Sequence, residues 1–86
     1  MKKVGIIMGS DRDLPIVQKA IDTLKAFNVP YEVHIFSAHR TPGEAAKFAQ
    51  NAQSNGFGVL IAAAGMAAHL GGAIAAQTVL PVIGIP

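Results

Sequence analysis

Three short polar segments of the 86-residue chain carry the side chains best suited to chemistry. They read GSDRD (residues 9–13), SAHRTP (37–42) and GMAAHLGG (65–72). The hydroxyls of Ser10 and Ser37 and the guanidinium of Arg40 suit a phosphate group, because arginine offers a forked pair of charged donors. The carboxylate of Asp13 suits ribose hydroxyls, as acidic residues do in nucleotide sites. The segments therefore favour a phosphorylated, nucleoside-like ligand.

Two histidines in these segments are suited to moving a proton. His39 immediately precedes Arg40, and His69 lies in a run of small residues. Each polar residue, taken alone, also fits an ordinary role as a helix cap, a solvated cation or a histidine bonded to a backbone carbonyl. Their coincidence at three places favours proton transfer on a phosphorylated substrate. We interpret His34, by contrast, as an ordinary polar residue of a strand.

Each polar segment follows an apolar run that is typical of a strand. These runs are KVGIIM (3–8), YEVHIF (31–36) and FGVLIAAA (57–64), and PVIGI (81–85) is a fourth. In YEVHIF the apolar side chains alternate with Glu32 and His34, which predicts a strand near the edge of a sheet.

The predicted strands alternate with predicted helices. Apolar residues spaced three and four apart predict a helix over 13–27, capped by Asp11 or Asp13. A capping box formed by Thr41 and Glu44 opens a second helix, which we expect to end near Asn55. A helix of small residues is expected over 67–78. This order predicts one α/β domain, residues 1–86, with a parallel sheet between helices, and brings the three polar segments to the carboxyl edge of that sheet.

The composition excludes several classes of function. Hydrophobic residues make up 51% of the chain and charged residues 14%, so an apolar surface that contacts another subunit is expected. The net charge of +2 comes from scattered cations, which predicts no nucleic-acid partner. The chain has no cysteine, as is usual in a reducing cytoplasm. The apolar stretch 59–76 contains His69 and three glycines, so we expect no membrane span there.

The sequence also lacks two kinds of cofactor signal. No His, Asp or Glu residues recur at metal-ligand spacing, and no dinucleotide-binding glycine fingerprint is present. We therefore expect neither a metal ion nor a nucleotide cofactor.

The motifs IIMGSDRD, SAHRTP, AAHL and LPVIGIP, in this order, resemble the 5-(carboxyamino)imidazole ribonucleotide mutase family of purine biosynthesis, also called the catalytic subunit of phosphoribosylaminoimidazole carboxylase. The resemblance implies a flavodoxin-like three-layer sandwich, here truncated after the fourth strand, that forms octamers and uses no cofactor. It implies that an aminoimidazole ribonucleotide is the substrate and that CO2 is transferred from its exocyclic nitrogen to a ring carbon. It makes His39 the catalytic acid and base, and it implies substrate-binding roles for Ser10, Asp13, Ser37, Arg40 and His69.

Two other hypotheses remain open from the sequence. One is a flavodoxin-like module that binds a mononucleotide without chemistry, although the three polar segments offer no aromatic side chain to stack on a flavin. The other is an inactive, truncated chain that only associates with other chains. We expect the isolated chain to be oligomeric or poorly soluble, because the strand at 81–85 ends the sequence without a helix to cover it.

Overall fold

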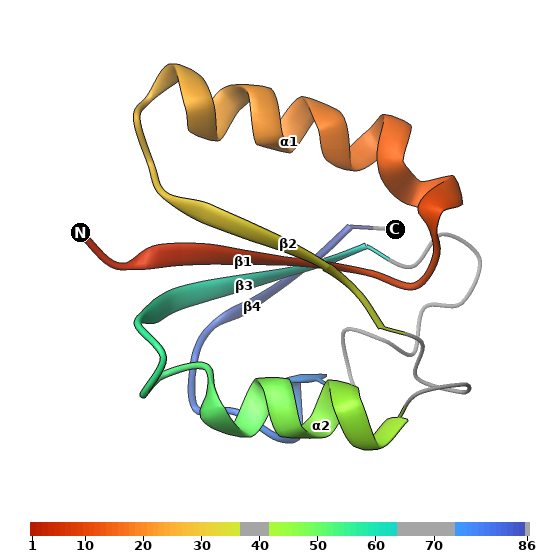
Figure 1. Ribbon diagram of the computed structural model, residues 1–86, viewed down its shortest axis with the longest axis vertical. Coiled ribbons are helices and arrows are strands. Elements are labelled where there is room, and N and C mark those ends of the chain that lie inside the picture. Colours follow the sequence, from red (N-terminus) through yellow and green to blue (C-terminus); the bar gives the residue numbers. More distant parts are fainter. Residues whose placement is uncertain (37–41, 64–73, 86) are drawn as a thin grey trace.

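The computed structural model describes residues 1–36, 42–63 and 74–85, which contain a four-stranded parallel sheet (Figure 1). The strands are β1 (Lys3–Met8), β2 (Tyr31–Ile35), β3 (Phe57–Ala63) and β4 (Val82–Ile85), in the spatial order β2-β1-β3-β4. All the pairings are parallel. The predicted α/β architecture is therefore confirmed, as is the place of β2 at an edge of the sheet.

Helix α1 (Leu14–Ala26) follows a 3-10 turn, η1 (Asp11–Asp13), and together they cover the predicted helix. Asp13 occupies the N-cap position of α1, as predicted, but the predicted side-chain cap is not formed there. The side chain of Ser10 caps η1 by accepting a hydrogen bond from the amide of Arg12 at 3.2 Å, whereas Asp13 makes no capping bond to α1. Serine can do this because its short hydroxyl reaches the unpaired amides of the first turn.

Helix α2 (Pro42–Asn51) ends four residues before the predicted Asn55. The carbonyl of Asn51, the last residue of the helix, accepts hydrogen bonds from the hydroxyl of Ser54 and from the amide of Asn55, both at 3.0 Å. The chain then turns through residues 52–56, and Gly56 adopts a left-handed φ of 93° before β3 begins. The predicted capping box depends on Thr41, which lies outside the described residues.

The predicted helix over 67–78 is described only from residue 74 onward. Residues 74 and 75 are helical, and the chain turns at 76 and 77. The helical part therefore ends before Thr78, whose hydroxyl instead accepts a hydrogen bond from the amide of Leu80 at 3.1 Å.

Helices α1 and α2 lie on opposite sides of the sheet, as Figure 1 shows. We call the two sides of the sheet the α1 face and the α2 face. The buried side chains of the α1 face are those of Val4, Ile6, Met8, Val17, Ile21 and Ala63. Those of the α2 face are Ile7, Ala45, Ala49, Ala52, Phe57, Leu60, Ala62 and Ile74. Helix α2 contributes only alanines to this buried set, and short side chains of this kind allow large neighbours to approach a helix closely.

Candidate active site at the carboxyl edge of the sheet

The carboxyl ends of the four strands lie in one row across the sheet. Met8 of β1 is paired with Ile35 of β2 on one side and with Ala63 of β3 on the other, and Ala63 is paired with Ile85 of β4. Adjacent strands of a sheet are about 4.8 Å apart. The strands that precede the three polar segments in the sequence therefore end at neighbouring points. The predicted convergence of these strand ends is confirmed.

Two hydrogen bonds extend this row beyond the strands. The amide of Phe36 donates to the carbonyl of Met8 at 2.8 Å, and the amide of Gly9 donates to the carbonyl of Ala63 at 3.1 Å. The first bond fixes Phe36 to β1 just before the segment 37–41 begins. The second fixes Gly9 to β3 just after β1 ends. Such backbone bonds give a site rigid starting points for its loops.

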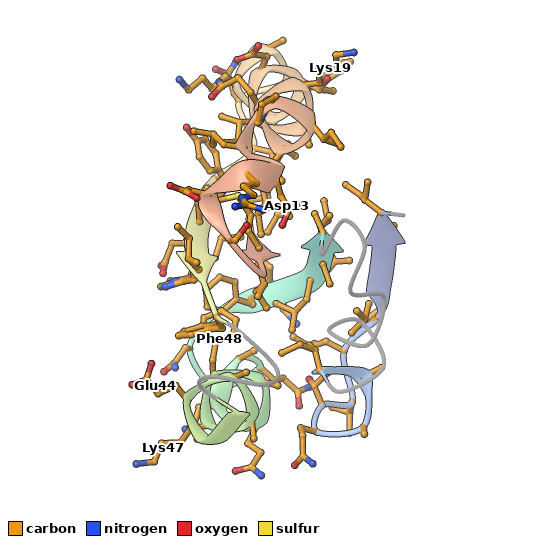
Figure 2. The ribbon with its side chains drawn as sticks, turned by 90° about the vertical axis from the view of Figure 1, so that its right-hand side faces the viewer. Asp13, Lys19, Glu44, Lys47 and Phe48 are labelled. Atoms are coloured by element: carbon orange, nitrogen blue, oxygen red, sulfur yellow. The ribbon has the colours of Figure 1, made fainter. Side chains whose placement is uncertain are left out.

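Ser10 and Asp13 come together directly after β1. The amide of Ser10 donates to Oδ2 of Asp13 at 3.4 Å, and the amide of Asp13 donates to the carbonyl of Ser10 at 3.2 Å. Asp13 is only 8% exposed, and it lies where η1 meets α1 (Figure 2). A buried carboxylate needs hydrogen-bond donors, and the Ser10 amide supplies one of them. The described contacts give both residues a structural role, and their binding of substrate stays a prediction.

The other predicted site residues are Ser37, His39, Arg40 and His69, and all of them lie outside the described residues. Their roles stay predictions. The structure bears on them only through the strand ends from which their segments begin. Within residues 1–36, 42–63 and 74–85, no three His, Asp or Glu side chains gather in a way that could hold a metal ion.

A polar group that the sequence reasoning did not anticipate lies on the α2 face. His34 and Lys3 both bond to the carboxylate of Glu32, and hydrogen bonds from Lys3 and then from His34 lower the pKa of Glu32. His34 shares a face of β2 with Glu32, as predicted, but aromatic side chains also surround it. The signal in the sequence was the alternation of Glu32 and His34 on one strand, with a lysine at the start of the neighbouring one.

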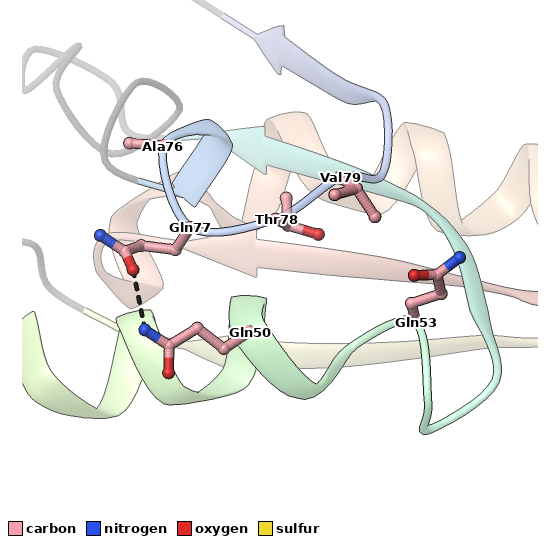
Figure 3. A pocket seen from close by; sticks show the side chains of 6 residues that line it. All are labelled: Gln50, Gln53, Ala76, Gln77, Thr78 and Val79. Carbon is pink, nitrogen blue, oxygen red and sulfur yellow. Dashed lines mark hydrogen bonds between the residues drawn. The ribbon is translucent and has the colours of Figure 1, made fainter.

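A hollow of about 410 Å³ lies away from this row (Figure 3). It is lined by Gln50, Gln53, Ala76, Gln77, Thr78 and Val79. The side-chain amide of Gln50 donates to Oε1 of Gln77 at 2.8 Å across it. Of the two predicted site residues that the structure describes, Ser10 and Asp13, neither lines this hollow. The helices described here are also too short or too polar to cross a membrane.

Comparison with known proteins decides which family this architecture represents. A family model described as AIR carboxylase matches residues 3–86. The chain belongs to the AIR carboxylase family. The three predicted polar segments all lie within the matched range.

Relatives of this chain carry two related names. The N5-carboxyaminoimidazole ribonucleotide mutase of Pyrococcus horikoshii is 59% identical over 83 residues, which is 96% of this chain and 47% of the relative. The mutase of Thermotoga maritima is 54% identical over 86 residues, 100% of this chain and 50% of the relative. The phosphoribosylaminoimidazole carboxylase of Ogataea methanolica is 58% identical over 83 residues, 96% of this chain but 15% of that protein.

A solved structure of a related protein has the same fold. The crystal structure of Treponema denticola PurE superimposes with a TM-score of 0.86 and 27% sequence identity, covering 94% of this chain and 52% of that one. The predicted flavodoxin-like fold is confirmed by this neighbour. The chain thus spans about half the length of the mutase relatives it matches.

Proposed function

We propose that the chain binds an aminoimidazole ribonucleotide at the carboxyl edge of its sheet and contributes to its isomerisation. The substrate is 5-carboxyamino-1-(5-phospho-D-ribosyl)imidazole, and the product is 5-amino-1-(5-phospho-D-ribosyl)imidazole-4-carboxylate. The observation that carries this proposal is the row formed by Met8, Ile35 and Ala63, which are the last residues of the strands that precede the three polar segments in the sequence. The names of the mutase relatives support the choice of reaction.

In the proposed mechanism, His39 carries one proton in both halves of the reaction. The imidazolium donates its proton to the carbamate nitrogen, the bond from that nitrogen to the carboxyl carbon breaks, and CO2 is released beside the ring. Carbon 4 of the imidazole then forms a bond to CO2, and the neutral His39 removes the proton from that carbon. The proton lent in the first half returns in the second, and no electron acceptor or donor is needed. CO2 must stay trapped, so the pocket has to exclude water.

The remaining predicted residues would hold the substrate. Arg40, with Ser10 and Ser37, would bind its phosphate, and Asp13 would bind the ribose. The fixed backbone around Ser10 and Asp13 supports this assignment, because it presents both residues from one turn directly after β1. His69 would complete the pocket from the segment after β3.

We also propose that active assemblies contain several copies of the chain. Ile83 and Val79 are 54% and 83% exposed. Large exposed apolar side chains favour association.

The relatives are about twice as long as the part that this chain matches. We therefore expect a chimera that joins this chain to the second half of the Thermotoga maritima mutase to be more active than the chain alone.

The experiment is a spectroscopic assay with two substrates. The chain, alone and in the chimera, is incubated either with the carboxyamino ribonucleotide or with aminoimidazole ribonucleotide and bicarbonate, and ultraviolet absorbance follows the carboxylated product. We expect rapid conversion of the first substrate and little of the second. Conversion of only the second would instead assign a carboxylase reaction, and binding without conversion of either would leave a non-catalytic nucleotide-binding module.

A further inference from the structure

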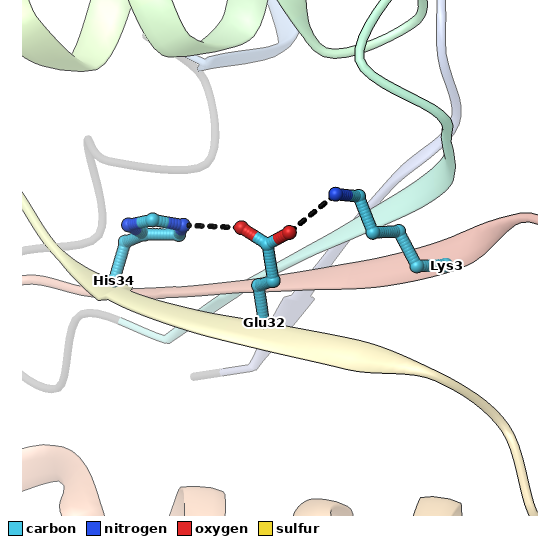
Figure 4. Close-up of polar contacts among 3 residues, drawn as sticks. All are labelled: Lys3, Glu32 and His34. Atoms are coloured by element: carbon cyan, nitrogen blue, oxygen red, sulfur yellow. Dashed lines mark hydrogen bonds and ion pairs between the residues drawn. The ribbon is translucent and has the colours of Figure 1, made fainter.

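A chain of polar contacts joins β1 to β2 on the α2 face. The Lys3 ammonium bonds to one oxygen of the Glu32 carboxylate, and Nε2 of His34 lies 3.1 Å from the other (Figure 4). The three side chains retain 29%, 42% and 34% exposure respectively, so the contacts are partly shielded from water. A carboxylate only accepts hydrogen bonds, so Nε2 of His34 carries the hydrogen in this contact.

The imidazole of His34 also belongs to an aromatic cluster, which we define as Phe36, Phe48 and Phe57. Its ring lies 5.6 Å from that of Phe36, nearly parallel at 4°, and 4.8 Å from that of Phe48. The cluster continues from Phe48 to Phe57 at 5.2 Å, and the Lys3 ammonium lies 4.5 Å from the centre of the Phe57 ring. The polar chain and the aromatic cluster thus close into one ring of contacts, in which His34 is fixed from two sides.

Phe36 is the link from this ring to the candidate site. It is the residue immediately before segment 37–41, its side chain packs on the α2-face core, and its amide bonds to the carbonyl of Met8. Whatever fixes Phe36 therefore fixes where segment 37–41 begins.

We propose that His34 is a positioning residue for the segment that carries Ser37, His39 and Arg40. Glu32 fixes the orientation of the imidazole, and the imidazole fixes Phe36 by stacking on it. The effect on catalysis rests on the proposed function, whereas the effect on Phe36 does not. His34 is engaged with Glu32 and with two phenylalanine rings, so this role suits it better than proton transfer to a substrate.

Hydrogen exchange at the Phe36 amide, measured by NMR on the full 86-residue chain, tests the proposal without any assay of activity. Replacing His34→Ala removes its contacts with Glu32, Phe36 and Phe48, and we expect exchange at Phe36 to accelerate by about tenfold, because two aromatic pairs and one charge-assisted bond are lost. The amides of Val4 and Leu60, which bond to Pro30 and Pro81, report the rest of the sheet. Their exchange should change less than about threefold.

Two further variants separate the contacts and guard against a folding defect. His34→Phe keeps a ring beside Phe36 and should restore at least half of the lost protection, whereas His34→Gln keeps only a donor for Glu32 and should restore less. Unchanged exchange at Phe36 in His34→Ala, or equal acceleration at Phe36, Val4 and Leu60, would overturn the proposal. Equal exchange in the Phe and Gln variants would overturn the role of the stack.

Measuring kcat of the same variants then tests whether the positioning role of His34 affects catalysis. In the form of the chain that isomerises the carboxyamino ribonucleotide, His34→Gln should lower kcat about tenfold and His34→Phe should recover most of it, following the exchange data. A fall in kcat without a change at Phe36 would overturn the positioning role. If no form of the chain turns over substrate while Phe36 still responds to His34, the positioning role stands and the proposed function fails.

Discussion

The α1 face and the α2 face cover the same strands with different side chains. On the α1 face, Val17 and Ile21 of the helix meet aliphatic residues of the sheet, and the described apolar buried set has no aromatic member. On the α2 face, the helix contributes alanines to the buried set, and phenylalanine rings fill the space between helix and sheet. The ring of contacts through His34 lies on this second face. The α1 face therefore stabilises the sheet, whereas the α2 face also connects its core to the start of segment 37–41.

The largest expected loss of stability comes from a substitution that would create a cavity on the α1 face. Ile6 is fully buried there, and Ile6→Ala should lower the free energy of unfolding by about 2–5 kcal/mol, because the surrounding side chains cannot fully close the space. Urea unfolding of the purified chain measures this. The control is Ile16→Ala on α1, where the side chain is 48% exposed and the change should be within about 0.5 kcal/mol. Equal losses in the two variants would contradict the description of this face.

A smaller loss is expected from overpacking the α2 face. A Cβ at Gly5 would lie 2.7 Å from Cδ2 of Leu60 and 3.1 Å from two atoms of the Phe57 ring. Gly5→Ala should therefore lower the free energy of unfolding by about 1–3 kcal/mol. Gly43→Ala is the matched control, because nothing lies within 4 Å of a Cβ there and alanine in α2 should be neutral or stabilise by up to about 1 kcal/mol. Tolerance of alanine at Gly5 would mean that this face is loosely packed.

The smallest expected effect is on how the free energy of unfolding depends on pH, and it comes from Glu32 on the α2 face. Hydrogen bonds from Lys3 and His34 hold the pKa of Glu32 below its ordinary value of 4.5. The unfolded chain therefore takes up this proton first as pH falls. The stabilisation by ionised Glu32 is complete above about pH 4.5 and is lost as pH falls through the lowered value.

Unfolding in urea between pH 3 and pH 6 measures this loss. Glu32→Gln should flatten the acid limb of the stability curve, whereas Glu44→Gln, which changes an exposed carboxylate of α2, should leave it in place. A parent chain whose stability is constant over this range would show that the polar chain of Lys3, Glu32 and His34 contributes nothing to folding.

Much of this fold could be predicted because the sequence patterns are local. The buried strand β1 is a continuous apolar run, and β2 alternates between faces, as expected of an edge strand. The position of the site follows from topology, since parallel strands bring their carboxyl ends to one edge. The end of α2 was less predictable, because the turn that follows it occupies residues 52–56, and the hydroxyl of Ser54 and the amide of Asn55 both bond to the carbonyl of Asn51.

The environment of His34 could not be predicted from β2 alone. Its polar neighbour Glu32 is two residues away, but its aromatic neighbours include Phe48 of α2, and Lys3 comes from another strand. Such contacts depend on how the helix packs on the sheet, which no short stretch of sequence encodes. The role of Ser10 was missed for a local reason: Asp11 and Asp13 lie beside it, and any of the three side chains could have capped this turn.

We propose that His39 is the one proton carrier for an aminoimidazole ribonucleotide bound at the carboxyl edge of the sheet. The most direct test compares His39→Asn with the parent in whichever form, chain or chimera, isomerises the carboxyamino substrate. Asparagine can hydrogen-bond but cannot carry a proton at neutral pH, so turnover should be abolished while substrate affinity stays within about tenfold of the parent. Turnover that survives the substitution would contradict the assignment of His39 and, with it, the mechanism proposed for this site.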